Sequence, residues 1–392
     1  MRILLVCEGD AGMYDSWSGV TRSLLTHLRA AGHTVHTADV DLYGIARAIV
    51  VARSASTSRR RWSTLYHLGA LGFRARSDRF AAFVREQGCD ADIVLQIGAT
   101  FEPPAGLNVP VALFCDSNID LSRSGASGFS EASVLSSEEI RAVHARETGV
   151  YEQASIIFTM SEMVRRSFIA DFGLPADRLV TIRCGPNVDP SAIEISVPQD
   201  VPESTILFVG RDPVRKGADL MLRAFRQVRE RMPRARLVMV GPPRGMAVPD
   251  GVEVMGFLDR DTSKGRSAMH AAYAASHVFC LPTRFDPFGT SFVEAMAYGL
   301  PCVGPDAWAV PEIIDHGRTG LLVPPEDPAA IAEALIAILS DDETRNRMGR
   351  AARERALSQF AWPVLVARML DSMQQVVDDR ARSASGGESS RA

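Results

Sequence analysis

Two carboxylates in one short run of the chain, Asp286 and Glu294, are the residues best placed to do chemistry. They stand eight positions apart, and a turn followed by the start of a short helix separates them. We expect an apolar strand at 277–281 to lead directly into the run, and Gly299 and Pro301 to close it. The run is therefore a candidate binding site between a strand and a helix.

The short helix of this run is expected to begin at Thr290 and Ser291, directly after Gly289. The first N–H groups of a helix lack intrahelical partners and lie at its positive dipole end, which suits a phosphate. Glu294, one turn further on, has apolar neighbours on both sides, where an unpaired carboxylate would be costly. Sugar hydroxyls are suitable partners for it, so the run predicts a nucleotide-sugar site. The alternative is a plain turn, containing Asp286, into an amphipathic helix with a solvated Glu294.

A second candidate loop lies earlier in the chain, where Arg211 and Lys216 bracket a turn. A strand is expected to end at Gly210, and a helix to begin at Gly217. A planar guanidinium and a compact ammonium together suit a pyrophosphate leaving group that carries extra negative charge. Each residue alone is a weak signal, because arginines are common in surface loops. If both loops follow parallel strands, they converge at one edge of a sheet.

Apolar strands alternate with amphipathic helices in two halves of the chain, which predicts α/β sheets of parallel type. The pattern lapses into an irregular stretch with Pro and Ser at 190–202 and then restarts. We expect two doubly wound, Rossmann-like domains facing each other across a cleft, at 1–190 and 203–362. A helix at 363–379 should follow, and then a disordered tail at 380–392 that lacks apolar periodicity.

The bulk composition excludes several classes of protein. Of the 392 residues 46% are hydrophobic and 23% charged, and the net charge of −4 argues against a nucleic-acid binder. No apolar run is long enough to span a bilayer, and the apolar start at 1–7 is too short for a signal peptide. The six cysteines form no Cys-x-x-Cys pair, which indicates reduced, structural thiols in a cytoplasmic protein.

One stretch, 47–85, is unusually basic. It holds nine arginines against a single acid, Asp78, and aromatic and aliphatic residues are interleaved with them. One interpretation is a solvated helix face with a loop. The other is a peripheral contact with anionic lipid at the inner face of the membrane, or with an anionic acceptor.

The run 281–303 resembles the signature of glycosyltransferase family 4, a family of retaining enzymes with the GT-B fold, which pairs two glutamates with seven residues between them. Further matches are 209–217, 256–258, 311–323 and 185–189. The resemblance covers nearly the whole chain and is densest over 205–325. It implies a donor domain in the second half, and a C-terminal helix that crosses back to the first domain.

The resemblance also implies how the donor diphosphate is held. Arg211 and Lys216 would bind it, and the helix start at Gly289, Thr290 and Ser291 would offer backbone and hydroxyl groups.

The rest of the donor is assigned in the same way. Glu294 would bind the ribose hydroxyls, and Phe257 with Leu258 would line the base pocket. Asp286 matches the first glutamate of the signature, which contacts the transferred sugar, but its side chain is one methylene shorter.

Two first-domain residues complete the implied site. Gly19 matches a glycine of the loop after the first strand, where backbone approaches the phosphate or the acceptor. Asp116 falls about where many relatives carry a histidine beside the sugar. It would bind a sugar hydroxyl or accept the acceptor's proton, although a simple turn residue at a strand end is the alternative.

The family mechanism implies a retaining hexosyltransferase that needs no metal and no cofactor beyond its UDP- or GDP-sugar donor. The leaving diphosphate would take the proton of a saccharide or lipid-linked acceptor, in the synthesis of cell-envelope polysaccharide, glycolipid or glycoconjugate. The Asp-x-Asp spacing at Asp39 and Asp41 falls after the second strand of the first domain, so no metal site is expected.

Other functions remain as alternatives. A nicotinamide oxidoreductase is disfavoured, because no Gly-x-Gly-x-x-Gly follows a strand. The signature run argues against an epimerase or a phosphorylase. A homologue that binds nucleotide sugar, or only a partner, without turnover stays open because of Asp286 and Asp116.

Overall fold

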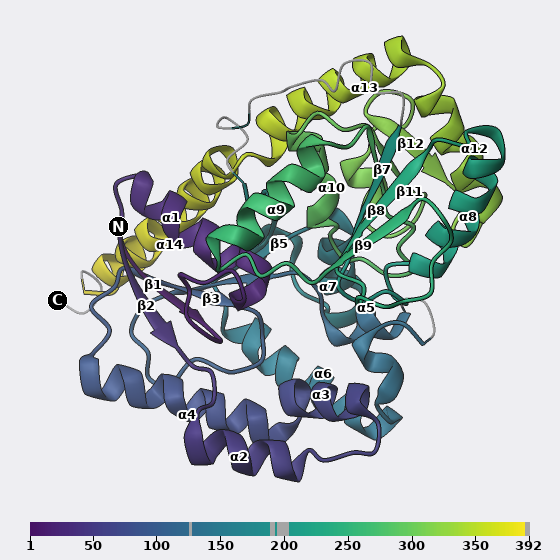
Figure 1. Cartoon of the computed structure of the whole chain (residues 1–392). Helices are drawn as coiled ribbons and strands as arrows, with labels where there is room; N and C mark the ends of the chain where they lie inside the picture. Colours follow the sequence, from purple (N-terminus) through teal and green to yellow (C-terminus); the bar gives the residue numbers. More distant parts are fainter. Residues whose placement is uncertain (125–127, 189–192, 194–203, 389–392) are drawn as a thin grey trace. The chain divides into compact units, whose positions relative to one another are not determined.

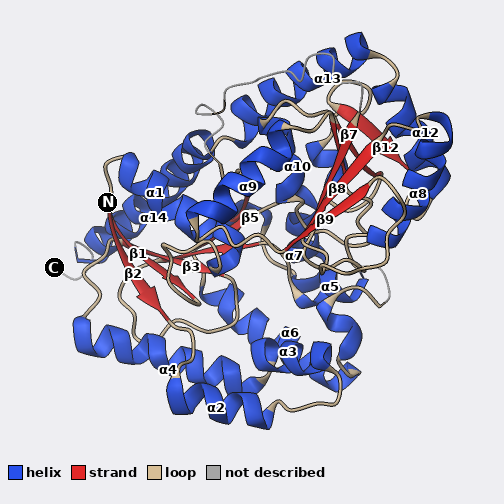
Figure 2. Cartoon of the chain, in the orientation of Figure 1, coloured by secondary structure: helices blue, strands red, loops and turns tan. Residues whose placement is uncertain are grey.

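The computed structural model describes residues 1–124, 128–188, 193 and 204–388. The chain divides into two compact units, one made of residues 1–183 with 365–392 and the other of residues 184–364. Figure 1 follows the chain through both in sequence colours, and Figure 2 separates helices from strands. Each unit contains one six-stranded parallel sheet with helices around it, so the predicted α/β class is confirmed.

The sheet of the first unit has the strand order β2-β1-β3-β4-β5-β6. Every residue of β3 and β4 is buried, because a parallel sheet covered on both faces requires continuous apolar strands. The strands are β1 (Arg2–Cys7), β2 (Thr34–Asp39), β3 (Ile93–Ile97), β4 (Val111–Cys115), β5 (Ile156–Thr159) and β6 (Leu179–Thr181). The helices are η1 (Ser16–Gly19), α1 (Val20–Ala30), α2 (Gly44–Arg53), α3 (Arg59–Leu68), α4 (Ala70–Gln87), α5 (Ile119–Ser124), η2 (Glu131–Val134), α6 (Ser137–Gln153), α7 (Glu162–Phe172) and η3 (Ala176–Arg178).

The sheet of the second unit has the order β12-β11-β10-β7-β8-β9, again with all neighbours parallel. The central position of β7 and β10 brings the loops that follow them to one edge of the sheet. The strands are β7 (Thr205–Val209), β8 (Arg236–Val240), β9 (Val252–Gly256), β10 (Val278–Cys280), β11 (Cys302–Pro305) and β12 (Gly320–Val323). The helices are α8 (Ala218–Arg231), α9 (Ser263–Ala274), α10 (Thr290–Ala297), α11 (Val310–Ile313), α12 (Pro328–Leu339), α13 (Asp342–Arg355) and the π-helical segment η5 (Ala356–Phe360).

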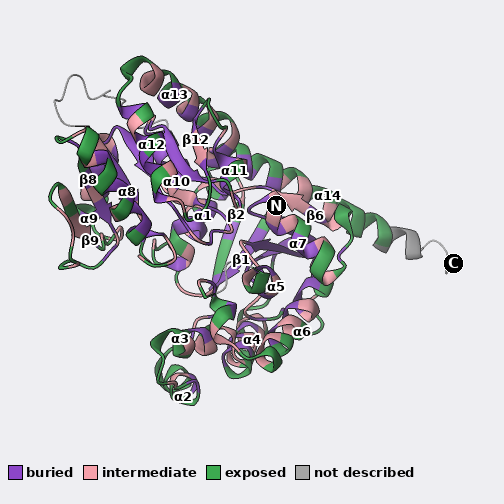
Figure 3. Ribbon diagram, turned by 90° about the vertical axis from the view of Figure 1, so that its right-hand side faces the viewer, coloured by how far each residue is buried: buried purple, intermediate pink, exposed green. Residues whose placement is uncertain are grey.

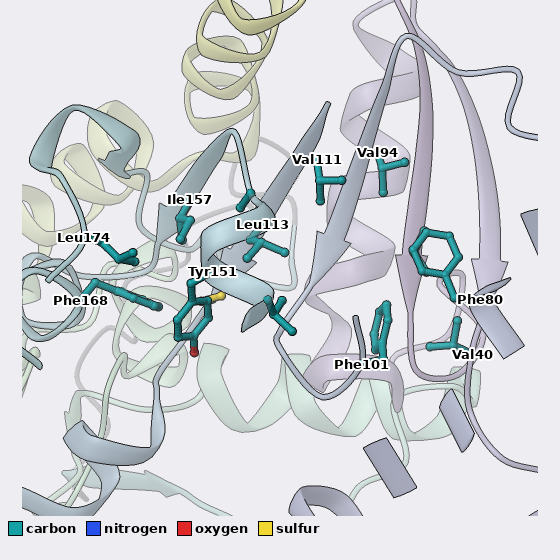
Figure 4. Packing of buried hydrophobic residues seen from close by; sticks show 14 of the residues in the cluster. Val40, Phe80, Val94, Phe101, Val111, Leu113, Tyr151, Ile157, Phe168 and Leu174 are labelled. Atoms are coloured by element: carbon teal, nitrogen blue, oxygen red, sulfur yellow. The ribbon is translucent and has the colours of Figure 1, made fainter. Parts of the chain in front are cut away.

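A cluster of buried apolar side chains joins the sheet of the first unit to its helices. Figure 4 shows part of it, with Phe80 of α4 beside Phe101 and Tyr151 of α6 beside Phe168 of α7. The two pairs meet edge to face, with ring centroids 6.0 and 4.7 Å apart. This geometry is favourable for aromatic rings and fixes the helices on the sheet.

The last helix, α14 (Trp362–Glu388), begins in the second unit and belongs to the first from Leu365 onward. The expected disordered tail at 380–392 is wrong as far as residue 388, because the helix continues through it. Local contacts support the extension, among them an Arg382–Asp379 ion pair and a hydrogen bond from Ser383 Oγ to the Asp379 carbonyl (2.9 Å). Residues 389–392 lie outside the described part of the chain.

The first unit ends earlier than the predicted residue 190. Residues 184–188 belong to the second unit, where Trp362 Nε1 donates to the Pro186 carbonyl (2.9 Å). Gly185 lies directly under the same indole, and a Cβ on it would come within 2.7 Å of the ring. None of the described helices is both long and apolar enough to span a membrane.

The basic stretch at 47–85 forms α2, α3 and α4, and several of its arginines are structural. Arg76 is completely buried and pairs with Glu8, with Nε and Oε2 2.6 Å apart. Arg60 donates to the carbonyls of Gly128 and Ser130, at 2.6 and 2.7 Å. A solvated helix face is therefore only part of the description.

Candidate functional site

In the second unit, an ion pair and hydrogen bonds join the loops that follow β7 and β10. The ammonium of Lys216 pairs with the carboxylate of Asp286. The Arg284 N–H donates to the Arg215 carbonyl (2.8 Å), and Arg215 Nη1 donates to the Phe285 carbonyl (3.0 Å). The structure thus brings together two residues that the sequence placed in separate candidate loops.

Glycine makes this close approach achievable. Gly217 has a φ of +74°, and a Cβ there would lie 2.0 Å from the carbonyl oxygen of Pro282. Any larger residue would therefore need both a left-handed backbone and a displaced loop. Gly217 also directly precedes α8, so Lys216 is held where the helix begins.

Lys216 and Asp286 form a nearly buried ion pair, with side chains 13% and 5% exposed. Burial lowers the pKa of Lys216 below its usual range, although the carboxylate of Asp286 opposes that shift. An ammonium held with so little water is costly unless it meets an anion. The sequence did not predict this pairing, since it assigned the two residues to different parts of the donor.

The helix start at α10 lies next to the pair. A Cβ on Gly289 would be 3.6 Å from Oδ2 of Asp286. No side chain caps α10, and its first turn, from Thr290 and Ser291, contains no acidic residue. The N–H groups at this end of the helix and its positive dipole end are therefore not already matched by a carboxylate of the helix itself.

Arg211 lies elsewhere on the same loop and contacts the segment after β9. Its guanidinium is 5.0 Å from the ring centroid of Phe257, a cation–π distance. The Phe257 side chain is 59% exposed, whereas the neighbouring Leu258 is partly buried. An exposed aromatic ring stacked under a cation offers a flat apolar surface beside a positive charge.

Glu294 is 2% exposed and has four donors around its carboxylate. Arg260 binds it through two parallel bonds, Nη1 to Oε1 at 2.6 Å and Nη2 to Oε2 at 2.7 Å. Tyr273 Oη donates to Oε2 at 2.8 Å, and the Asn187 N–H donates to Oε1 at 3.3 Å. Burial alone would raise the pKa of Glu294, but the charge and hydrogen bonds of Arg260 outweigh it and leave that pKa lowered.

These partners correct one expectation. The sequence correctly required a partner for Glu294 but offered only sugar hydroxyls, and missed Arg260, Tyr273 and Asn187. A solvated Glu294 is also wrong. Asn187 stands in the matched 185–189 segment, and Arg260 stands two positions beyond the matched 256–258 segment. The two motifs therefore pointed to the neighbourhood of both partners.

The two remaining predicted site residues belong to the first unit. Gly19 has a φ of +87° directly before α1, after Trp17 and Ser18, which also adopt left-handed backbone conformations. Asp116 directly follows the last residue of β4. Both therefore stand after carboxyl ends of strands, as their predicted roles require.

Comparison with known proteins finds a family match in the second unit. Residues 203–341 match the family model described as "Glycosyl transferases group 1". The second unit therefore carries the sequence pattern of the group 1 glycosyltransferases. The matched segment contains every predicted second-unit residue of the site.

Among the curated relatives is the GDP-mannose-dependent alpha-(1-6)-phosphatidylinositol monomannoside mannosyltransferase of Mycobacterium tuberculosis. It is 31% identical over 189 residues, which are 45% of this chain and 49% of the relative. Across four of the curated relatives, the match spans 43 to 62% of their length.

Solved structures similar to this chain share its two-domain GT-B fold. Sucrose-phosphate synthase from Thermosynechococcus elongatus has a TM-score of 0.72 at 19% identity, covering 97% of this chain and 100% of that one. HepE of Anabaena, in complex with UDP and glucose, has a TM-score of 0.65 at 16% identity, covering 96% and 100%.

Proposed function

We propose that this protein is a retaining glycosyltransferase that moves a hexosyl group from a UDP- or GDP-sugar to a hydroxyl acceptor. The observation that carries the proposal is the cluster of Lys216, Asp286 and the uncapped start of α10 at one edge of the second sheet. A buried cation beside helix N–H groups is a combination that suits a diphosphate.

The donor would bind in parts. Lys216 and Arg211 take the diphosphate, together with the N–H and hydroxyl groups of Thr290 and Ser291. The exposed ring of Phe257 stacks on the base, with Leu258 at its edge. The names of the relatives support this donor class, since one is GDP-mannose-dependent and one structure contains UDP.

The reaction needs little covalent chemistry from the protein. The bond between the anomeric carbon and the diphosphate oxygen breaks, the acceptor oxygen bonds to the same face of that carbon, and its proton passes to the leaving diphosphate. Lys216 and Arg211 stabilise the charge that develops on the diphosphate, without a metal. Asp286 orients hydroxyl groups of the sugar.

The first test is a thermal-shift screen of the protein against UDP, GDP, ADP and TDP, followed by their sugars. All four nucleotides are screened at one concentration, so the tightest binder gives the largest shift. A nucleotide present at a hundred times its Kd stabilises the fold by about 2.7 kcal/mol. Saturable hydrolysis of the matching sugar nucleotide then separates an enzyme from a non-catalytic homologue. Stabilisation by none of the four would refute the proposal.

We further propose that the acceptor is saccharide or lipid-linked, in cell-envelope synthesis, and that the protein works at the cytoplasmic face of a membrane. Helix α2 supports this, because much of it is exposed (Figure 3). Only Val50 of its ten residues is buried, while Ile45 and Ile49 are 79% and 54% exposed. These two isoleucines lie on one face, since they stand one turn apart. Exposed apolar side chains of this kind mark interaction sites.

The charge of the same region suits an anionic lipid surface. Arg47, Arg53 and Arg59 are exposed, and none of them forms an ion pair with a described residue. Trp62 of α3 is partly exposed and donates to the Val51 carbonyl of α2 (2.8 Å), so an aromatic side chain contacts this helix. Basic and aromatic side chains beside an apolar face are typical of interfacial helices.

Sedimentation with vesicles tests this contact. The protein should bind vesicles containing anionic lipid more strongly than neutral ones, and the double change Ile45→Ser with Ile49→Ser should weaken that binding at least ~10-fold. Leu357→Ser, at an exposed residue of η5, is the matched control and should leave binding unchanged. Equal binding by both variants would contradict the assignment of α2.

A further inference from the structure

The carboxylate of Glu294 has no acceptor position left for a ligand. A carboxylate offers about four lone-pair positions, two on each oxygen. Oε1 receives Arg260 Nη1 and the Asn187 N–H, and Oε2 receives Arg260 Nη2 and Tyr273 Oη. A ribose diol can therefore reach this carboxylate only if one of these donors leaves.

Two of the donors are fixed in place. Tyr273 is completely buried in α9, and its ring stacks on Tyr298 with centroids 5.0 Å apart and an interplanar angle of 10°. The Asn187 donor is a backbone N–H, in the segment that packs beneath Trp362. Neither can withdraw without a rearrangement of the core.

Arg260 is different, because it comes from the connection between β9 and α9. Its side chain is 18% exposed, whereas that of Glu294 is 2% exposed, so it covers the carboxylate from the solvent side. The same connection contains Phe257 and Leu258, where the base is expected. A ligand that binds the connection therefore acts directly on the residue that occupies the carboxylate.

We propose that Arg260 competes with the donor for the ribose-binding carboxylate of Glu294, and that the ribose 2′- and 3′-hydroxyls displace it when the donor binds. This inference rests on the proposed nucleotide-sugar function. The two neutral hydroxyls replace the two guanidinium bonds on Glu294. The released guanidinium then lies near a donor that carries the negative diphosphate. Arg260 is accordingly a specificity-determining residue: in the wild-type protein it lowers the affinity that the ribose hydroxyls add to donor binding.

The test is a pair of dissociation constants. UDP or GDP, whichever binds, is compared with its 2′,3′-dideoxy form by calorimetry, and the ratio of the two Kd values measures what the hydroxyls contribute. The ratio is the Kd of the dideoxy form divided by the Kd of the parent nucleotide. In Arg260→Ala the hydroxyls no longer compete with a guanidinium, so this ratio should rise at least ~10-fold, which corresponds to about 1.4 kcal/mol. Arg260→Lys, which can bind only one oxygen at a time, should give an intermediate ratio.

Matched variants make the outcome decisive. Arg266→Ala also removes one arginine beside this loop, but Arg266 donates to the Arg260 and Asp261 carbonyls and not to Glu294, so its ratio should stay at the wild-type value. Glu294→Gln should reduce the ratio toward one in the Arg260→Ala background. An unchanged ratio in Arg260→Ala and Arg260→Lys would overturn the inference. Should Arg260→Ala fail to fold, an unchanged ratio in Arg260→Lys alone would overturn it. Failure of the wild-type protein to bind any nucleotide would instead refute the proposed function.

Discussion

Replacing Lys216 by methionine should separate the structural role of the Lys216–Asp286 pair from its proposed catalytic role. The variant leaves the carboxylate of Asp286 nearly buried without its cation, and breaking a buried ion pair costs about 3–5 kcal/mol of stability. It also removes a charge that would stabilise the leaving diphosphate, a loss of about 100- to 1,000-fold in turnover. Both effects should be visible in the single variant.

The double variant, with Asp286→Asn added, should behave differently in the two measurements. The neutral amide no longer needs a cation, so most of the lost unfolding free energy should return in urea denaturation. Turnover, followed by release of the nucleoside diphosphate, should stay at least ~100-fold below wild type, because the cation is still missing. Recovery of turnover in the double variant would refute the role of Lys216 as a charge stabiliser. Unchanged stability of Lys216→Met would refute the energetic argument for the pair.

Two further predictions concern stability. Burial raises the pKa of Glu147 from 4.5 to about 8, with Asp120 adding to the shift and the Ile119 N–H opposing it. Between about pH 4.5 and 8 the folded state therefore keeps a proton on Glu147 that the unfolded chain has lost. As the pH rises through this window, the free energy of unfolding should fall by roughly 1.4 kcal/mol per pH unit. Thermal melts of Glu147→Gln should lack this slope. Gly217→Ala should destabilise the protein by at least ~2 kcal/mol and weaken donor binding, because its Cβ meets the Pro282 carbonyl. Gly245→Ala is the control: its φ is also positive, +87°, but a Cβ there would meet no atom within 4 Å, so it should cost only about 1 kcal/mol. Equal losses in the two glycine variants would argue against the close contact.

Much of this architecture could be predicted from sequence, because strand and helix periodicity report which faces are buried. The start of α10 at Thr290 was predicted at the right residue, since a turn and a change of period mark it. The convergence of the Arg211–Lys216 loop with the Asp286 loop followed from the assumption of parallel strands. Periodicity does not report which side chains from distant segments meet.

For that reason the partners of Glu294 were missed. Asn187 is 107 positions away from it, and Arg260 is 34 positions away, in a loop without regular periodicity. The helical tail was missed for a related reason. Its composition lacks an apolar stripe, and its extension depends on a local ion pair of Asp379 and on continuity with a helix that is already packed.

The path of α14 has a consequence for how the protein is made. The second unit is one continuous segment, 184–364, whereas the first lacks the residues from Leu365 onward until the whole second unit has been synthesised. Leu365, Val366, Met369 and Met373 of that segment are all buried. Domains usually fold from the N-terminus as the ribosome releases them. Here the unit that is synthesised first is completed last, so a chain truncated at residue 364 would carry a complete second unit beside an unfinished first one.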